Sequence, residues 1–133
     1  MRIMIDANVI YSALTLPISL VGKRLQHIKE NHTLVLCEYV IKESEDIFRE
    51  KRPKDLERFK LLLNNMADEV FDLNEINETK YPHIRDIKDY PVLANAIKAD
   101  VDLLITGDTD FDDVKNIKKP RIITPGEYEK IFM

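Results

Sequence analysis

Short apolar runs alternate along the chain with longer segments in which apolar residues recur every three or four positions. The short runs are predicted to be β-strands, and the longer segments have the period of amphipathic helices. This alternation is typical of an α/β fold built on a parallel sheet. The predicted strands are residues 2–6, 33–36, 69–72, 102–106 and 121–124.

Helical patterns fill the gaps between these strands. In the segment 54–66, for example, Phe59, Leu62 and Leu63 are expected to face the core. The polar segment 74–90 is expected to be a long loop or partly helical, and loops of that length are uncommon unless they are functional. The segments predicted to be helical are 8–14, a stretch carrying Leu25 and Ile28, 38–51, 54–66, a stretch that begins at Pro91, and 126–132.

Composition limits the class of protein. With 133 residues, of which 44% are hydrophobic and 33% charged, residues 1–133 are expected to form a single domain around one core. No apolar run approaches the roughly 20 residues of a membrane span, and the start lacks a signal-peptide pattern. The single cysteine, Cys37, follows an apolar run and is expected to be a buried structural thiol. A cytoplasmic protein without a membrane partner is the prediction.

The net charge of −4 and the pI near 5.4 argue against tight, nonspecific binding to duplex nucleic acid through charge alone. A nuclease is still compatible with that charge, because bound divalent cations reverse the sign of the local field. Basic residues also cluster at 23–29, 49–54 and 115–121. These clusters are either solvated helix ends and loops or contacts to a phosphate backbone.

Acidic residues stand where predicted strands end and helices begin. Asp6 closes the first strand, Asp108 and Asp110 follow the fourth, Asp89 precedes the helix at Pro91, and Glu43 lies inside the helix over 38–51. In an open parallel sheet, ligands bind beyond the carboxyl ends of the strands. Carboxylates gathered there repel one another unless a cation joins them, and hard oxygen ligands suit magnesium or manganese. The acids therefore predict a metal-dependent enzyme that acts on phosphate.

Each acid also has an ordinary structural interpretation. Asp6 can cap the helix that begins at Asn8, while Asn8 can orient Asp6 or cap the helix itself. Glu43 can be a boundary residue beside the apolar side of its helix. Asp89 can cap the following helix, and it is preferred to Asp86 as a ligand because it lies nearer the start of that helix. Capping and metal binding are compatible, because one carboxylate has two oxygens.

The densest candidate site follows the fourth strand. Gly107 is expected to permit a sharp turn there, Asp108 and Asp110 project from the turn, and Phe111 anchors it in the core. The next two aspartates are expected to face solvent. The whole run is Thr106-Gly107-Asp108-Thr109-Asp110-Phe111.

Other chemistries have weaker support in the sequence. The three histidines are scattered, no Ser-His-Asp or Cys-His arrangement is evident, and there is no Gly-rich phosphate loop. A phosphoryl-transfer domain with Asp6 as the nucleophile would need an acidic partner where Asn8 stands and a lysine after a late strand, and neither is clear.

These motifs resemble those of the PIN-domain ribonucleases, especially the toxin components of prokaryotic toxin–antitoxin systems. The resemblance runs from the first strand to Pro125. Ala7 departs from it, because the family often has Thr or Ser there, which removes a hydroxyl near Asp6 but no carboxylate. The matching runs are Ile3-Met4-Ile5-Asp6-Ala7-Asn8-Val9, Val40-Ile41-Lys42-Glu43, Asp86-Ile87-Lys88-Asp89-Tyr90-Pro91 and Leu104-Ile105-Thr106-Gly107-Asp108-Thr109-Asp110-Phe111.

The resemblance implies an α/β/α sandwich around a mainly parallel sheet of four to five strands. It also implies cleavage of RNA with Mg²⁺ or Mn²⁺, a small antitoxin partner and possible homodimers. A non-catalytic PIN-like module that binds RNA or a protein is the alternative. For an active nuclease, the resemblance implies three metal ligands, Asp6, Asp89 and Asp108. It further implies Glu43 and Asp110 as ligands of a second ion or of water, with Asn8 and Thr106 orienting the carboxylates.

Overall fold

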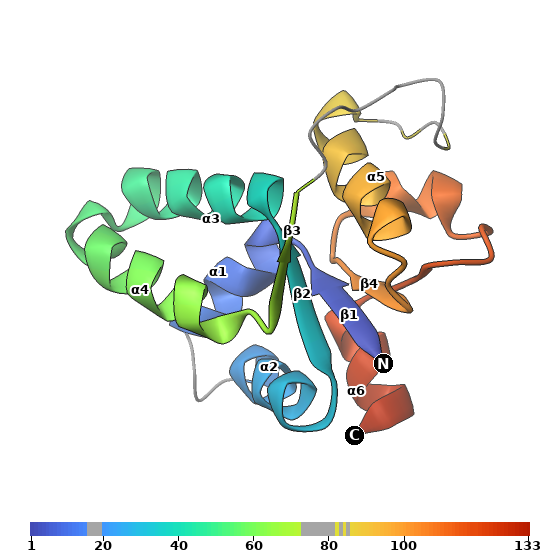
Figure 1. Ribbon diagram of the computed structural model, residues 1–133, viewed down its shortest axis with the longest axis horizontal. Helices are drawn as coiled ribbons and strands as arrows, with labels where there is room; N and C mark the ends of the chain where they lie inside the picture. Colours follow the sequence, from blue (N-terminus) through green and yellow to red (C-terminus); the bar gives the residue numbers. More distant parts are fainter. Residues whose placement is uncertain (16–19, 73–81, 83, 85) are drawn as a thin grey trace.

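The computed structural model describes residues 1–15, 20–72, 82, 84 and 86–133, and its centre is a five-stranded sheet (Figure 1). All neighbouring strands are parallel, in the order β3-β2-β1-β4-β5. The strands are β1 (Arg2–Ile5), β2 (Thr33–Cys37), β3 (Glu69–Phe71), β4 (Leu103–Ile105) and β5 (Arg121–Ile123). All five match strands predicted from the sequence.

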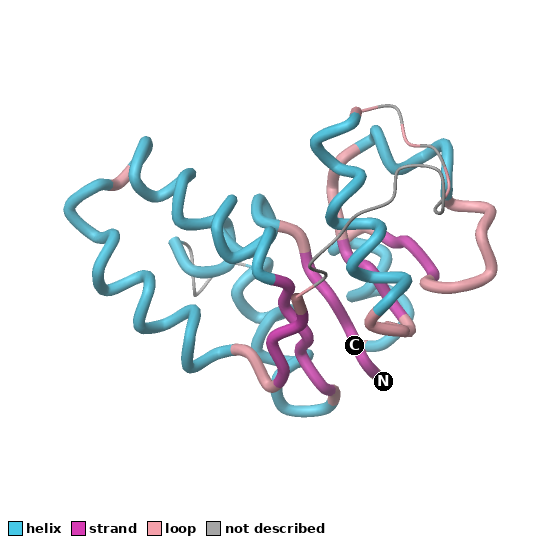
Figure 2. The backbone as a smooth tube through the Cα atoms, turned by 45° about the horizontal axis from the view of Figure 1, so that its top comes forward, coloured by secondary structure: helices cyan, strands magenta, loops and turns pink. Residues whose placement is uncertain are grey.

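Helices lie on both sides of the sheet: α3 and α4 are to its left in Figure 1 and α5 is to its right, and Figure 2 shows the strands between them. The predicted α/β/α sandwich is thus confirmed. None of the described helices is long and apolar enough to cross a membrane. The helices are α1 (Ala7–Thr15), α2 (Leu20–Asn31), α3 (Glu38–Lys51), α4 (Leu56–Met66), α5 (Tyr90–Lys98) and α6 (Pro125–Phe132), with short 3-10 helices η1 (Pro53–Asp55), η2 (Ile87–Asp89) and η3 (Thr109–Val114).

The central position of β1 in the sheet explains why its sequence is a continuous apolar run. Ile3, Met4 and Ile5 are all fully buried, because the strand has a partner on each edge and is covered on both faces. Ile5 lies opposite Ile105 of β4, so the two strands end at the same level. Cys37, at the end of β2, is buried as predicted, and burial raises the pKa of its thiol to about 11.

Three details differ from the sequence-based expectations. The residues after Asp108 form the 3-10 helix η3 where only a turn was expected. Leu62 is 49% exposed, whereas Phe59 and Leu63 of α4 are buried. Gly107 does not have a positive φ, so the turn after β4 does not require a glycine for its backbone conformation. Most of the expected loop over 74–90 lies outside the described residues, apart from the turn that contains η2.

The strand order creates a switch point between β1 and β4. The chain moves outward from β1 to β2 and β3, then returns to the other side of β1 for β4 and β5. Connections therefore leave the carboxyl ends of β1 and β4 in opposite directions, and an open α/β sheet binds its ligands at such a point. Asp6 and Thr106 are the residues that follow these two strands.

Candidate metal centre at the strand ends

Asp6 occupies the switch point and is only 7% exposed. Its Oδ1 accepts a hydrogen bond from the backbone N–H of Val9 at 3.0 Å, which caps α1, and its Oδ2 accepts one from the hydroxyl of Thr106. Asp6, and not Asn8, is therefore the cap, and the capping role coexists with a place in the candidate site. Burial raises the pKa of Asp6, and the hydrogen bond from Thr106 acts in the opposite direction.

A chain of hydrogen bonds continues from Thr106 into the acidic run after β4. The hydroxyl oxygen of Thr106 accepts from the N–H of Asp108 at 3.0 Å, and Oδ1 of Asp108 accepts from the N–H of Asp110 at 2.9 Å. The second of these bonds caps η3. Thr106 is thus hydrogen-bonded to both Asp6 and the backbone of Asp108. Its role in supporting a metal site stays a prediction.

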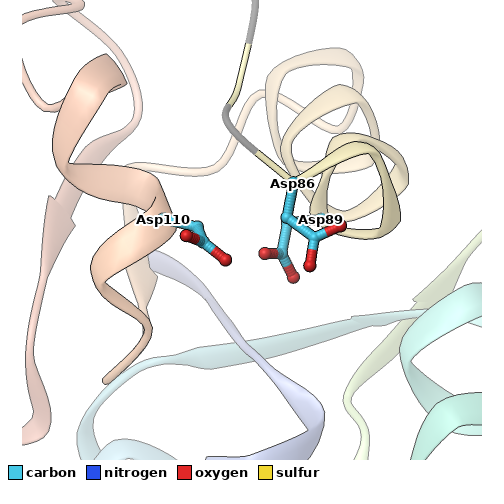
Figure 3. A group of neighbouring side chains, drawn as sticks. All are labelled: Asp86, Asp89 and Asp110. Carbon is cyan, nitrogen blue, oxygen red and sulfur yellow. The ribbon is translucent and has the colours of Figure 1, made fainter.

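Three aspartates converge beside this chain (Figure 3). One carboxylate oxygen from each of Asp86, Asp89 and Asp110 lies within 4.8 Å of the others, which is an arrangement that could hold a metal ion. Asp86 and Asp89 stand one turn of η2 apart, with the N–H of Asp89 donating to the carbonyl of Asp86 at 3.0 Å. Residues three apart are eclipsed in a 3-10 helix, so both side chains reach the same place. The sequence analysis preferred Asp89 to Asp86 as a metal ligand, but the structure places the two carboxylates together. Their three-residue spacing is the sequence feature that could have indicated this.

Asp89 is the most informative member of this group. Its Oδ2 is buried and has no hydrogen-bond partner, which is rare for a buried polar atom and indicates an ion or water. Burial raises the pKa of Asp89 to about 7, and the neighbouring Asp108, Asp86 and Asp110 add to the effect. A divalent cation would partner the orphaned oxygen and offset this repulsion, so the residues present fit a metal ion.

Glu43 approaches the same site from α3. It is half-buried, and burial followed by the charge of Asp6 raises its pKa to about 7, with a further contribution from Asp86. Near it, the hydroxyl of Tyr39 donates to the backbone carbonyl of Lys88 at 2.8 Å and so joins the start of α3 to η2. Sequence analysis did not single out Tyr39, and nothing in its local pattern marks it.

The opposite end of the sheet has a different electrostatic character. There Arg2 pairs with Glu69 at 2.5 Å, which lowers the pKa of that carboxyl group. The pKa of Asp102 is lowered mainly by a hydrogen bond from the backbone N–H of Arg2 at 2.8 Å, and Lys119 at 3.5 Å adds to the effect. Among the described residues, no such cation pairs with Asp6 or Asp89. Asp6 and Asp89 thus differ from Glu69 and Asp102, whose charges are offset by basic side chains.

Most of the basic clusters noted in the sequence take part in ion pairs on the surface. This observation favours the solvated-surface interpretation for those residues over a phosphate-contact role. The pairs are Arg24–Glu129, Lys29–Asp68, Arg49–Asp46, Arg52–Asp55, Lys115–Asp112 and Lys119–Asp100.

A cavity of about 340 Å³ opens beside the acids. It shares Asp6 and Asp108 with the hydrogen-bonded chain described above, and exposed Asn8 lies on its wall. Such a volume is within the range of small-molecule sites. The other described residues that line it are Val9, Ser12, Gly107 and Pro125.

Comparisons with known proteins agree with this architecture. Residues 2–110 match the family model described as PIN domain. No curated protein sequence matches the chain. Among solved structures, the chain is similar to the crystal structure of VapBC2 from Rickettsia felis bound to a DNA fragment from their promoter, with a TM-score of 0.65 and 16% identity over 93% of this chain and 97% of that one. At 16% identity, the structural similarity shows only that the two proteins share a fold. The family model matches most of the sequence and therefore shows the family. This chain belongs to the PIN-domain family.

Proposed function

We propose that this protein is a divalent-metal-dependent endoribonuclease and the toxin component of a toxin–antitoxin pair. The observation that carries the proposal is the buried, unpartnered Oδ2 of Asp89 among converging carboxylates. PIN-domain membership supports a nuclease, and the position at the switch point of the sheet supports a ligand site.

The geometry favours Asp86, Asp89 and Asp110 as ligands of Mg²⁺ or Mn²⁺, with Asp108 beside them. The sequence-based assignment gave Asp6, Asp89 and Asp108, and it stays a prediction, as does the role of Asn8. When bound, the cation would offset the charge of the scissile phosphate and lower the pKa of water.

The protein's own groups have separate tasks in this proposal. The carboxylate of Glu43, which is half-buried on α3, would accept a proton from the water that attacks phosphorus, the task of a general base. The bond between phosphorus and the leaving ester oxygen would then break, and that oxygen would take up a proton from solvent water while Glu43 later releases its own. Thr106 holds the carboxylate of Asp6 in one orientation while this happens.

The toxin part of the proposal rests on the sequence motifs and on the similar VapBC2 structure, whose description names a complex bound to promoter DNA. By analogy, this chain would act on RNA in the cytoplasm, bind a small antitoxin protein and form homodimers. Co-purification of this chain with the product of a neighbouring small gene would test the pairing separately from catalysis.

The experiment for the nuclease is cleavage of a mixed-sequence, fluorescently labelled single-stranded RNA by the purified protein. It is run with Mn²⁺, with Mg²⁺ and with a chelator, and repeated with Asp108→Asn. Asp112→Asn is the matched control, because this nearby side chain is exposed and pairs with Lys115 at 3.3 Å. We expect metal-dependent cleavage that Asp108→Asn abolishes and Asp112→Asn retains. A folded protein that binds the metal but cuts no RNA would contradict the proposal and favour the non-catalytic module.

A further inference from the structure

We infer that the cavity beside Asp6 and Asp108 binds the ribose and base of the nucleotide next to the scissile phosphate, and that Gly107 keeps this cavity open. The inference rests on the proposed nuclease function and adds a substrate subsite to it. It starts from the position of the cavity, which shares those two aspartates with the acidic site. A nucleotide whose phosphate lies at the acids can therefore reach the cavity directly.

The lining of the cavity favours the sugar and base over a phosphate. The carboxylates of Asp6 and Asp108 on its wall would repel a second phosphate, whereas Val9 and Pro125 offer apolar surface. None of the described residues that line it is aromatic, so at these residues binding would depend on shape and hydrogen bonds without stacking on a ring. The cavity is thus suited to a neutral, partly apolar group.

Two polar side chains on the wall supply the hydrogen-bonding capacity that such a group needs. Asn8 carries an amide with both donors and an acceptor, and Ser12 carries a hydroxyl that can act either way. Proteins recognise single-stranded RNA through base edges and the ribose 2′-hydroxyl, which offer matching donors and acceptors. Asn8 and Ser12 are therefore the residues that would set the preference for one nucleotide.

Gly107 provides an independent observation at the same cavity. Apart from its two chain neighbours, no described residue has an atom within 4 Å of a Cβ added at this position, and the residue does not have a positive φ. Neither packing nor backbone conformation therefore demands a glycine. A larger residue would place its side chain in open space at the cavity wall, where a bound nucleotide has to pass close to the backbone.

The test compares Gly107→Ala and Gly107→Val with the wild type. Gly126→Ala is the control, because the added Cβ would meet only the hydroxyl oxygen of Thr124 at an ordinary 3.9 Å. Steady-state cleavage of the labelled single-stranded RNA in Mn²⁺ gives kcat, KM and the positions cut. Mn²⁺ affinity is measured by calorimetry and folding by thermal unfolding.

We expect KM to rise by a few-fold in Gly107→Ala and by about tenfold or more in Gly107→Val, since small displacements of a substrate are costly. Mn²⁺ affinity should stay at the wild-type value and Tm should not fall. The positions cut should change, and Gly126→Ala should behave as wild type. The Ala variant keeps the test decisive if the Val variant does not fold.

Two results would overturn the subsite. One is an unchanged KM and an unchanged cleavage pattern in the folded Gly107 variants. The other is a loss of Mn²⁺ affinity that matches the loss of activity, because the added side chain would then act on the metal site. A wild-type protein that cuts no RNA in Mn²⁺ would instead refute the proposed function, so the two failures are distinguishable.

Discussion

The hydroxyl of Thr106 donates a hydrogen bond to Oδ2 of Asp6, across a sequence separation of 100 residues. Both residues are buried, and each is the first residue after its strand. The same hydroxyl accepts from the N–H of Asp108 at 3.0 Å. One side chain therefore connects the ends of β1 and β4 and fixes two carboxylate positions of the candidate site.

Replacing Thr106 by Val should test this connection, because it keeps the shape of the side chain and removes the hydroxyl. Oδ2 of Asp6 then loses its donor, and the N–H of Asp108 loses its acceptor. We expect the free energy of unfolding in urea to fall by about 1–3 kcal/mol, the usual range for a buried group left without a partner. Thr106→Ser retains the hydroxyl and should recover most of the loss. Wild-type stability in Thr106→Val together with a loss in Thr106→Ser would show that the methyl group, and not the hydrogen bond, matters.

The pKa of Asp89 leads to a prediction about stability and pH. In the metal-free folded protein it is raised to about 7 from an ordinary value of 3.8, mainly by burial. The folded state therefore holds more protons than the unfolded state between about pH 4 and pH 7, so this group lowers stability as pH rises through that window. Asp89→Asn removes the effect and should raise Tm at pH 8 by roughly 2–5 °C, as expected for about 1 kcal/mol in a domain of this size.

The comparison is made by thermal unfolding in a chelator at pH 4 and pH 8. The gain in Tm from Asp89→Asn should be present at pH 8 and small at pH 4. Glu43→Gln should act in the same direction, because the pKa of Glu43 is also raised to about 7. A loss of stability at pH 8 in both variants would show that these carboxyl groups stabilise the metal-free fold.

Tyr39 is expected to position the aspartates of η2. Its hydroxyl donates to the carbonyl of Lys88, which lies between Asp86 and Asp89. Tyr39→Phe removes this bond and should weaken Mn²⁺ binding about three- to tenfold, while unfolding changes by about 0.5–1.5 kcal/mol, the usual value of one hydrogen bond. Calorimetric titration measures the affinity directly. Unchanged Mn²⁺ affinity in Tyr39→Phe would show that the hydrogen bond from Tyr39 to Lys88 stabilises the fold but does not position the metal ligands.

Removing a hydrogen bond far from the acidic site should lower stability without changing metal binding or RNA cleavage. Tyr128 of α6 is fully buried, and its hydroxyl lies 2.7 Å from Nδ1 of His27 on α2. Tyr128→Phe should lower the free energy of unfolding by about 1 kcal/mol. Mn²⁺ affinity and RNA cleavage should stay at wild-type values in the folded protein. A change in Mn²⁺ affinity would show that the packing of α6 is coupled to the acids.

The strands and the place of the acids were accessible from the sequence for a physical reason. Buried parallel strands need continuous apolar runs, and a charge directly after such a run, as at Asp6 and Asp108, has to lie at the end of the sheet. The family motifs then indicated which acids belong together. Local patterns and the topology rules of parallel sheets were sufficient for these features.

The remaining features depend on a local turn conformation or on tertiary contacts, which the pattern of apolar residues does not encode. Asp86 converges with Asp89 because the segment between them is a 3-10 turn, which composition does not reveal. The bond from Tyr39 to Lys88 and the cavity at Gly107 bring together residues from distant elements. Gly107 lies directly after a strand, where a glycine often provides a special backbone angle, but its φ is not positive and it borders open space.

The most direct test of the account is calorimetric titration of the purified protein with Mn²⁺ at pH 7.5. It compares the wild type, Asp89→Asn and the surface control Asp112→Asn. The account predicts that Mn²⁺ binds to the wild type and to Asp112→Asn, and that Asp89→Asn loses at least about tenfold in affinity, the loss expected when a ligand is removed. Equal binding by all three proteins, or no binding by the folded wild type, would contradict the assignment of the converging carboxylates as a metal centre.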